Sequence, residues 1–402
     1  MNKKLIPALA FALVGILASC GGGSTVANKD KPLVFFNRLP SDPTTGAIDT
    51  TPMGHSDKTF YVGFDAAGGG TVQGKMITDY LKTKKLADLD KDGDKKIGYV
   101  LCIGDTGHND SKARTSGVRK ALGTWTDAGA TTPGAANTQV GSVVLADGTY
   151  PVVELDSKEM KSTAGATWDA TTAGDALSTW VASKGNTINL ILSNNDGMAM
   201  GCLAQSNFPT GTPIFGYDAN ADAVQSIIDG KLTGTVSQNV DAQATATLQV
   251  LRNMFDGLTG DKIHTAGISE ADASGSKISA TVDYVAASKA LLAQNTAVTA
   301  ANAANYKSGT RDTGVKQHPS TVATKKVLLT LYNAGDNFLS GSYKPALKYY
   351  APLLNLDLNI VEGDGQSEST ILDKFTNLSN YDAYAINMVK TNSGADYLNK
   401  LA

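Results

Sequence analysis

The sequence contains little of what zinc-binding or nucleic-acid-binding proteins need. It has three cysteines and four histidines in 402 residues, and their spacing matches no zinc site. The formal net charge is −3, which argues against a nucleic-acid partner, since phosphate binding requires a basic face. Cys102 and Cys202 lie in apolar stretches, where buried free thiols are expected rather than a disulfide. The chain is 42% hydrophobic and 18% charged, which predicts a folded body long enough for two domains.

The N-terminus also lacks a run that fits a transmembrane helix. Residues 5–17 are apolar but too few to span a bilayer, and they follow two lysines. The run ends in LASC at residues 17–20, which resembles a bacterial lipobox. That resemblance implies a signal peptide over residues 1–19, a lipid on Cys20 and a flexible tether over residues 20–29. An ordinary secretory signal with a coincidental cysteine is the alternative.

Strand-length apolar runs alternate with helix-periodic segments along most of the chain. Residues 59–64 and 97–104 have the strand pattern, for example, and residues 71–82 between them have the helical one. A strand followed by a helix, repeated, predicts parallel sheets with helices on both faces. The units are too numerous for one sheet, so we expect an α/β fold of two Rossmann-like lobes. Residues 295–324 are rich in Ala, Thr, Asn and Ser, lack a strand pattern and indicate a linker.

Several motifs together indicate a family. They are VFFN at 34–37, GHNDSKAR at 107–114, TWD at 167–169, NNDGMAMG at 194–201, GYD at 216–218 and YNAGDNF at 332–338. With these motifs the chain resembles the galactose/glucose-binding proteins of sugar ABC transporters, which are periplasmic binding proteins of type 1. The segment that resembles the start of such a protein stands at residues 325–338, and the segment that resembles its middle stands at 32–41. The resemblance therefore implies a circularly permuted variant.

The resemblance also implies how the chain is divided. Two lobes would be joined by a three-segment hinge that closes on a ligand. The first lobe is expected to contain residues 30–56, 239–280 and 325–402. The second is expected to contain residues 57–238 and 281–294, and residues 295–324 would join the ancestral ends, which often lie close together in compact folds.

Ten positions match the ligand residues of the family. The resemblance assigns sugar binding to Asn37, His108, Asp110, Arg114, Trp168, Asn195, Asp218, Gln238, Asp336 and Phe338. One of them departs from the family pattern, because Gln238 stands where an Asn is expected. The longer side chain keeps the amide but changes its reach, which could alter affinity or the preference between sugar epimers.

The chemistry of these side chains agrees with a pyranose ligand. Carboxylate, amide and guanidinium groups match the hydroxyls on the edge of the ring, and flat aromatic rings match its C–H faces. Trp168 and Phe338 are the two candidates for a sandwich around the ring. Taken singly, each residue has an ordinary explanation: an Asp after a strand often caps a helix, a Trp usually packs, and Asn195 could cap a helix at 196–204.

A metal site is expected from the acidic stretch DLDKDGD at residues 88–94. Its alternate oxygen ligands and its Gly resemble the first half of an EF-hand loop. The family resemblance implies calcium there, closed by a distant Glu. Position 12 of the loop is Tyr99, and Asn189 replaces the distant Glu, so the expected ligands are Asp88, Asp90, Asp92, Asp94 and Asn189. A solvated acidic turn is the alternative.

No organic cofactor is expected. GGTVQGK at residues 69–75 has the spacing of a phosphate-binding loop, but Met76 stands where Ser or Thr is needed. The resemblance implies a monomeric, periplasmic, lipid-anchored protein that delivers D-glucose or D-galactose to an ABC permease in the inner membrane. A sugar sensor for a chemoreceptor is one alternative. A sugar-active enzyme using His108 and Asp110 as acid and base is less favoured, because the sequence shows no nucleophile–base signature.

Overall fold

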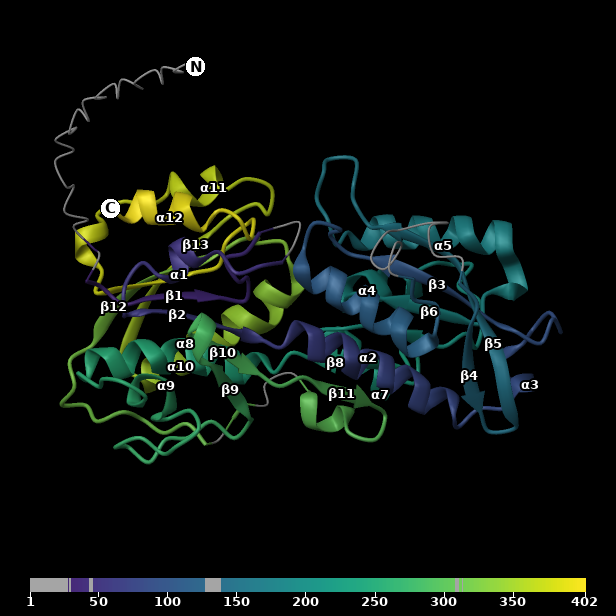
Figure 1. The fold of residues 1–402 in the computed structure, drawn as a ribbon, viewed down its shortest axis with the longest axis horizontal. Coiled ribbons are helices and arrows are strands. Elements are labelled where there is room, and N and C mark those ends of the chain that lie inside the picture. Colours follow the sequence, from purple (N-terminus) through teal and green to yellow (C-terminus); the bar gives the residue numbers. More distant parts are fainter. Residues whose placement is uncertain (1–27, 29, 43–45, 127–138, 308–310, 313) are drawn as a thin grey trace, which may run out of the picture.

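The computed structural model describes residues 28–402 except 29, 43–45, 127–138, 308–310 and 313. The expected signal peptide, Cys20 and all of the tether except residue 28 lie outside the described residues. The described chain forms two α/β lobes that lie side by side along the longest axis (Figure 1). Every helix in this part of the chain is too short or too polar to cross a membrane.

The first lobe is built on a seven-stranded sheet in the order β13-β12-β14-β1-β2-β10-β9. All neighbours are parallel except the edge strand β9, which runs antiparallel to β10. Helices α8 and α10 lie on one side of the sheet and α11 and α12 on the other (Figure 1). The elements are β1 (Leu33–Phe36), β2 (Thr59–Phe64), β9 (Val282–Val285), β10 (Ala290–Ala293), β12 (Lys325–Leu331), β13 (Leu356–Glu362), β14 (Ala383–Ile386), α1 (Thr50–Met53), α8 (Val240–Phe255), α9 (Lys262–Thr265), α10 (Lys344–Leu353), α11 (Ser369–Leu372) and α12 (Gly394–Leu401).

The second lobe has another seven-stranded sheet, in the order β11-β8-β7-β6-β3-β5-β4. Its central strands are parallel, and the edge strands β4 and β11 are antiparallel to their neighbours. The elements are β3 (Ile97–Ile103), β4 (Gly141–Leu145), β5 (Gly148–Glu159), β6 (Leu190–Ser193), β7 (Ile214–Phe215), β8 (Gly234–Ser237), β11 (Thr296–Thr299), α2 (Ala66–Leu81), α3 (Leu86–Leu89), α4 (Asn109–Leu122), α5 (Ala170–Lys184), α6 (Asp196–Leu203) and α7 (Ala221–Ile228).

Strand β3 shows why this sheet is covered on both faces. Alternate side chains of a strand point to opposite sides. Tyr99 and Leu101 join the core under α2 and α4, whereas Val100 and Cys102 join the core under α5 and α6. Both faces of the strand are therefore buried, as expected for a parallel sheet between two helix layers. The predicted fold class of two such lobes is confirmed.

The two predicted buried cysteines meet in one of these cores. Cys102 at the end of β3 and Cys202 in α6 are both fully buried, with 3.7 Å between their Sγ atoms. Both are free thiols, as the sequence predicted. The Cys202 thiol also donates to the carbonyl of Ala173, so the pair is accommodated without a covalent bond.

The predicted division of the chain into lobes and linker is wrong in three places. Strand β2 was expected in the second lobe but pairs with β1 along its length, with Thr59 opposite Leu33. Residues 281–294 were also expected there, but β9 and β10 belong to the first sheet. The expected linker is in part a strand, because β11 pairs with β8 in the second sheet. Hydrogen bonding between strands decided these memberships, and the local apolar pattern did not contain that information.

The chain consequently passes between the lobes at four places among the described residues. These are near residue 65, at 238–239, at 294–295 and within 300–324. The last passage exists because η4 (Ala303–Tyr306) packs on the second lobe, whereas β12 lies in the first. The predicted hinge had only three segments. The ends of the described chain lie together, with the Asn28 side chain donating to the carbonyl of Leu401 at 2.6 Å.

Candidate functional site

All ten residues that were predicted to bind a sugar line one cavity between the lobes. Arg38, Tyr332 and Leu339 complete its wall. Most of the ten lie just beyond the carboxyl end of a parallel strand, such as Asn37 after β1 and Gln238 after β8. Because these strand ends meet at one edge of each sheet, residues far apart in sequence converge where the two edges face each other.

Two flat rings come from opposite lobes. Trp168 belongs to the second lobe and Phe338 to the first, and both line the cavity. The Trp168 backbone has φ +62°, an unusual conformation for a bulky residue. The ring lies so close to Gly104 that a Cβ there would come within 2.4 Å of it. The glycine therefore provides the space in which the indole is held.

Arg114 organises the charged groups of the second lobe. Its guanidinium stacks on the Tyr217 ring at 3.7 Å and donates to the carbonyl of Asn194 at 2.7 Å. The same Nη1 atom lies 3.3 Å from Oδ1 of Asp218, and both side chains are at most 5% exposed. Gln238 also donates through Nε2 to this Asp218 oxygen, by a short hydrogen bond. Asp218 is thus held by two donors from different elements, Arg114 in α4 and Gln238 just after β8.

In the first lobe, Asp336 is fixed by its surroundings. Its Oδ2 accepts a hydrogen bond from the Tyr332 hydroxyl at 2.5 Å, and its Oδ1 accepts one from the Leu339 N–H at 2.9 Å. Arg38 stacks over the Tyr332 ring at 3.6 Å and donates to the Val389 carbonyl. Sequence reasoning missed Arg38 and Tyr332. Two features of the sequence could have indicated them: Arg38 directly follows Asn37, and Tyr332 directly follows β12.

Burial shifts the pKa of three groups in the site. Burial raises the pKa of Asp218 to about 7, with Arg114 opposing the shift and Asp336 adding to it. Burial also raises the pKa of Asp110, against the nearby charges of Arg114 and Arg38. Burial first, and then these two arginines, holds the pKa of His108 well below its usual value. The imidazole is therefore neutral at physiological pH. The Asp218 carboxyl changes its protonation state close to that pH.

The hydrogen bonds of His108 define its tautomer. Its Nδ1 accepts the backbone N–H of Asp110 at 3.2 Å, which caps α4. A neutral imidazole that accepts at Nδ1 carries its proton on Nε2. Asn195 likewise caps α6, because its Oδ1 accepts the Met198 N–H at 2.8 Å. Both residues therefore cap a helix and line the cavity, so the helix-capping alternative and the site assignment are compatible.

Four polar atoms of the residues that line the cavity are buried without a hydrogen-bond partner among the described residues. They are Nε2 of His108, Nε of Arg114, Nε1 of Trp168 and Oε1 of Gln238. Buried polar groups in native proteins are nearly always paired, so unpaired ones in a cavity wall indicate a ligand-binding site. Three of these atoms are donors and one is an acceptor. A ligand that satisfies them must both donate and accept hydrogen bonds.

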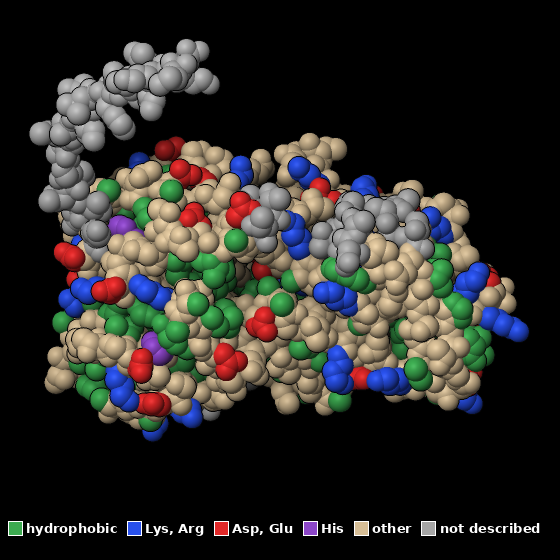
Figure 2. All heavy atoms as spheres, viewed as in Figure 1, with side chains coloured by type: hydrophobic (Ala, Val, Ile, Leu, Met, Phe, Trp, Pro, Cys, Tyr) green, Lys and Arg blue, Asp and Glu red, His purple; other side chains and the backbone are tan. Residues whose placement is uncertain are grey.

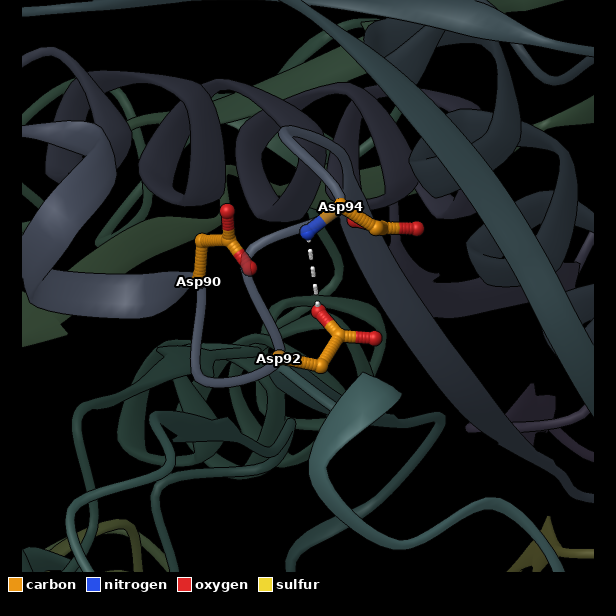
Figure 3. A group of neighbouring side chains, drawn as sticks. All are labelled: Asp90, Asp92 and Asp94. Atoms are coloured by element: carbon orange, nitrogen blue, oxygen red, sulfur yellow. Dashed lines mark hydrogen bonds between the residues drawn. The ribbon is translucent and has the colours of Figure 1, made fainter.

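The predicted calcium ligands do not assemble as a set. Asp90, Asp92 and Asp94 offer oxygens that lie within 4.8 Å of one another (Figure 3). Asp88 instead accepts the backbone N–H of Lys85 at 2.8 Å, at the start of α3. The side-chain oxygen of Asn189 accepts the N–H of Gly98 at 2.7 Å. One oxygen of Asp88 and the amide oxygen of Asn189 therefore have other partners, and only three of the five expected ligands come together.

Comparisons with known proteins identify the family. Residues 25–259 match a family model described as a periplasmic binding protein domain, and residues 324–394 match a second model with the same description. The chain is 34% identical over 265 residues to the D-galactose/methyl-galactoside binding periplasmic protein MglB of Haemophilus influenzae, covering 63% of this chain and 66% of that protein. It is 28% identical over 110 residues to a xylitol-binding protein of Mycolicibacterium smegmatis, covering 27% of this chain and 30% of that protein.

The matched part spans less than two thirds of the length of each of these relatives. Among solved structures, a solute-binding protein of Clostridium phytofermentans with bound β-D-glucose has a TM-score of 0.41 and 18% identity, covering 67% of this chain and 69% of that one. The longer family match covers more than half of the sequence, from residue 25 to residue 259. The chain therefore belongs to the type 1 periplasmic binding protein family.

Proposed function

We propose that this protein binds a hexose, D-glucose or D-galactose, and delivers it to an ABC importer. The unpaired Nε2 of His108, Nε of Arg114, Nε1 of Trp168 and Oε1 of Gln238 carry the proposal. A sugar ring is a ligand that donates and accepts around its whole edge while it offers apolar C–H faces to aromatic rings. The similarity to a galactose-binding protein supports the same ligand class.

Different types of side chain contact different parts of the sugar. The carboxylates of Asp110, Asp218 and Asp336 accept hydrogen bonds from ring hydroxyls. Arg114 and the neutral His108 donate, and the amides can do both. The aromatic rings of Trp168 and Phe338 cover the two faces of the sugar. Since they come from opposite lobes, closure on the ligand brings the sandwich together and excludes water from the polar contacts.

Calorimetric titration of the lipid-free protein with D-glucose and with D-galactose tests this function. We expect heat of binding with at least one of them and none with Trp168→Ala. Trp180→Phe is the matched control and should leave binding unchanged, because Trp180 lies in α5, is buried in the core of the second lobe and does not line the cavity. If neither hexose gives heat with the wild-type protein, the proposed ligand is wrong.

The cellular setting is part of the proposal. We place the protein in the periplasm, bound to a membrane through Cys20 and in contact with a permease of the inner membrane. Acidic and basic side chains are interspersed on the face shown in Figure 2, in keeping with a protein that has no nucleic-acid partner. A sugar-active enzyme is disfavoured, since His108 is neutral and the described residues that line the cavity include no Ser, Thr, Cys or Lys as a nucleophile. Incubation with each hexose should yield no product.

We also propose that the chain is circularly permuted. The strands β12, β13 and β14 from the C-terminal part complete the sheet that β1 and β2 begin, and β14 pairs directly with β1. The contact between Asn28 and Leu401 shows how short a connection between the present ends could be. A variant with these ends joined and new ends opened within 300–324 should fold and bind the same sugar. Loss of folding in that variant would argue against permutation.

A further inference from the structure

The acidic loop at residues 88–96 lacks an oxygen ligand at more than one position where a bound cation would need one. Counted as an EF-hand-like loop from Asp88, positions 1, 3, 5 and 7 are aspartates. Position 9, which commonly supplies a ligand directly or through water, is Lys96. Position 12, where a bidentate Glu closes such loops, is Tyr99. A cationic side chain thus stands where an oxygen donor is expected.

The carboxylates of this loop have partners within the loop itself. The Lys96 ammonium lies 3.4 Å from Oδ2 of Asp94, and the Lys96 backbone N–H donates to the other oxygen at 2.9 Å. The two oxygens of Asp90 accept the N–H groups of Gly93 at 2.8 Å and Lys95 at 3.0 Å. The negative charge is therefore met by the loop's own ammonium and backbone donors.

Asn189 joins the two flanks of this loop. It precedes β6, is 2% exposed and makes hydrogen bonds through both ends of its amide. Its Oδ1 accepts from Gly98 in β3 at 2.7 Å, and its Nδ2 donates to the carbonyl of Leu89 at the end of α3 at 2.9 Å. One neutral side chain thus connects the segment before the loop to the strand after it.

We propose that the Asn189 amide and the Lys96 ammonium replace a divalent cation as the structural tie of this loop. Asn189 holds the two flanks together, and Lys96 neutralises the acidic turn. The loop then has its folded conformation without metal. This inference concerns the stability of the second lobe and does not depend on the proposed sugar ligand.

Thermal unfolding of the purified protein in calcium chloride and in excess chelator tests the proposal. The wild-type Tm should be the same in both. Asn189→Ala should lower the Tm by roughly 4–8 °C in both buffers, because two buried backbone groups lose their partner. Asn186→Ala, a nearby exposed position, is the matched control and should have no effect.

A gain-of-function variant makes the test sharper. Lys96→Gln combined with Asn189→Glu returns oxygen donors to both positions, and its Tm should rise when calcium is added. Calorimetric titration with calcium chloride provides a second readout that does not depend on Tm, with no heat expected for the wild-type protein. Calcium binding by the wild type, or an Asn189→Ala protein as stable as the wild type, would overturn the proposal. A double variant indifferent to calcium would also contradict it.

Discussion

Lowering the pH from 8 to 5 should weaken hexose binding about a hundredfold. The group responsible is Asp218, whose pKa burial raises to about 7 in the ligand-free protein. Its carboxylate accepts hydrogen bonds on both oxygens, from Arg114 and Gln238 at Oδ1 and, in the proposed complex, from a sugar hydroxyl at Oδ2, whereas the acid must use one oxygen as a donor. His108 does not interfere, because its pKa is held well below its usual value and the ring stays neutral.

The magnitude follows from the fraction of ionised Asp218. If only the carboxylate binds, the apparent Kd increases tenfold for each pH unit below the pKa, which gives about a hundredfold, or roughly 2.7 kcal/mol, at pH 5. At pH 8 the group is almost fully ionised and the Kd reaches its lower limit. Asp110, whose pKa is also raised by burial, changes the profile in the same direction.

The pH dependence of the stability of the ligand-free protein should be opposite to that of the binding affinity. A folded-state pKa of about 7 against 3.8 for the free side chain means that the folded form holds the proton more tightly. This group therefore stabilises the fold at low pH, and the contribution is lost as the pH rises from about 4 to 7. The full difference is on the order of 4 kcal/mol. Sugar should consequently raise the Tm more at pH 8 than at pH 5.

Calorimetric titration between pH 5 and 8 measures the binding profile, and scanning calorimetry with and without sugar measures the stability profile. Asp218→Asn is the control, because an amide does not titrate in this range. That variant should bind more weakly but with a much flatter pH dependence. A wild-type Kd that stays constant from pH 8 to 5 would refute the reasoning, as would an equally steep profile in Asp218→Asn.

Three further predictions concern single contacts. Gln238 donates to Asp218, so Gln238→Ala should move the midpoint of the binding profile to higher pH, and an unchanged midpoint would contradict the contact. Arg119 and Glu154 form a fully buried ion pair with 2.5 Å between Nη2 and Oε1, so Arg119→Ala should cost about 3–5 kcal/mol in urea unfolding, with a smaller loss if both partners become methionine. Cys102 and Cys202 should react with a thiol reagent only after denaturation, and rapid labelling of either of these two residues in the native protein would contradict their burial.

The fold class was predictable because apolar runs of two lengths alternate along the chain. The β3 run of residues 97–103 is apolar enough to be buried on both faces, as it is in the second lobe. Which sheet a run joins was not predictable in the same way. The sequence TFYVGF of β2 has nothing that distinguishes a partner in either lobe, and β1 became its neighbour through hydrogen bonds made only in the folded state. Strand β11 was missed because TAVT is short and lies in a polar, low-complexity stretch.

The candidate site was predicted more completely than the lobe boundaries, for a physical reason. Ligand chemistry limits the residue types strongly, and in this chain motifs of several residues surround them, as at Trp168 and Asp336. Asn189 shows the limit of that reasoning. Its place in the sequence was identified, but the direction of its amide depends on Gly98 and Leu89, which approach from other elements. A ligand assignment from a residue type is therefore less secure than one from a residue type together with its partners.

The cavity also shows how stability and specificity oppose each other in this fold. Each buried polar atom without a partner costs about 1–3 kcal/mol, and the cavity wall contains four of them, on His108, Arg114, Trp168 and Gln238. An ionised Asp218 adds a further cost at neutral pH, because burial disfavours its charge. A hydroxyl-rich ring removes all of these costs at once, whereas a molecule that lacks one hydroxyl leaves an atom unpaired. The same features that weaken the ligand-free protein thus allow it to discriminate between ligands that differ in a single polar group.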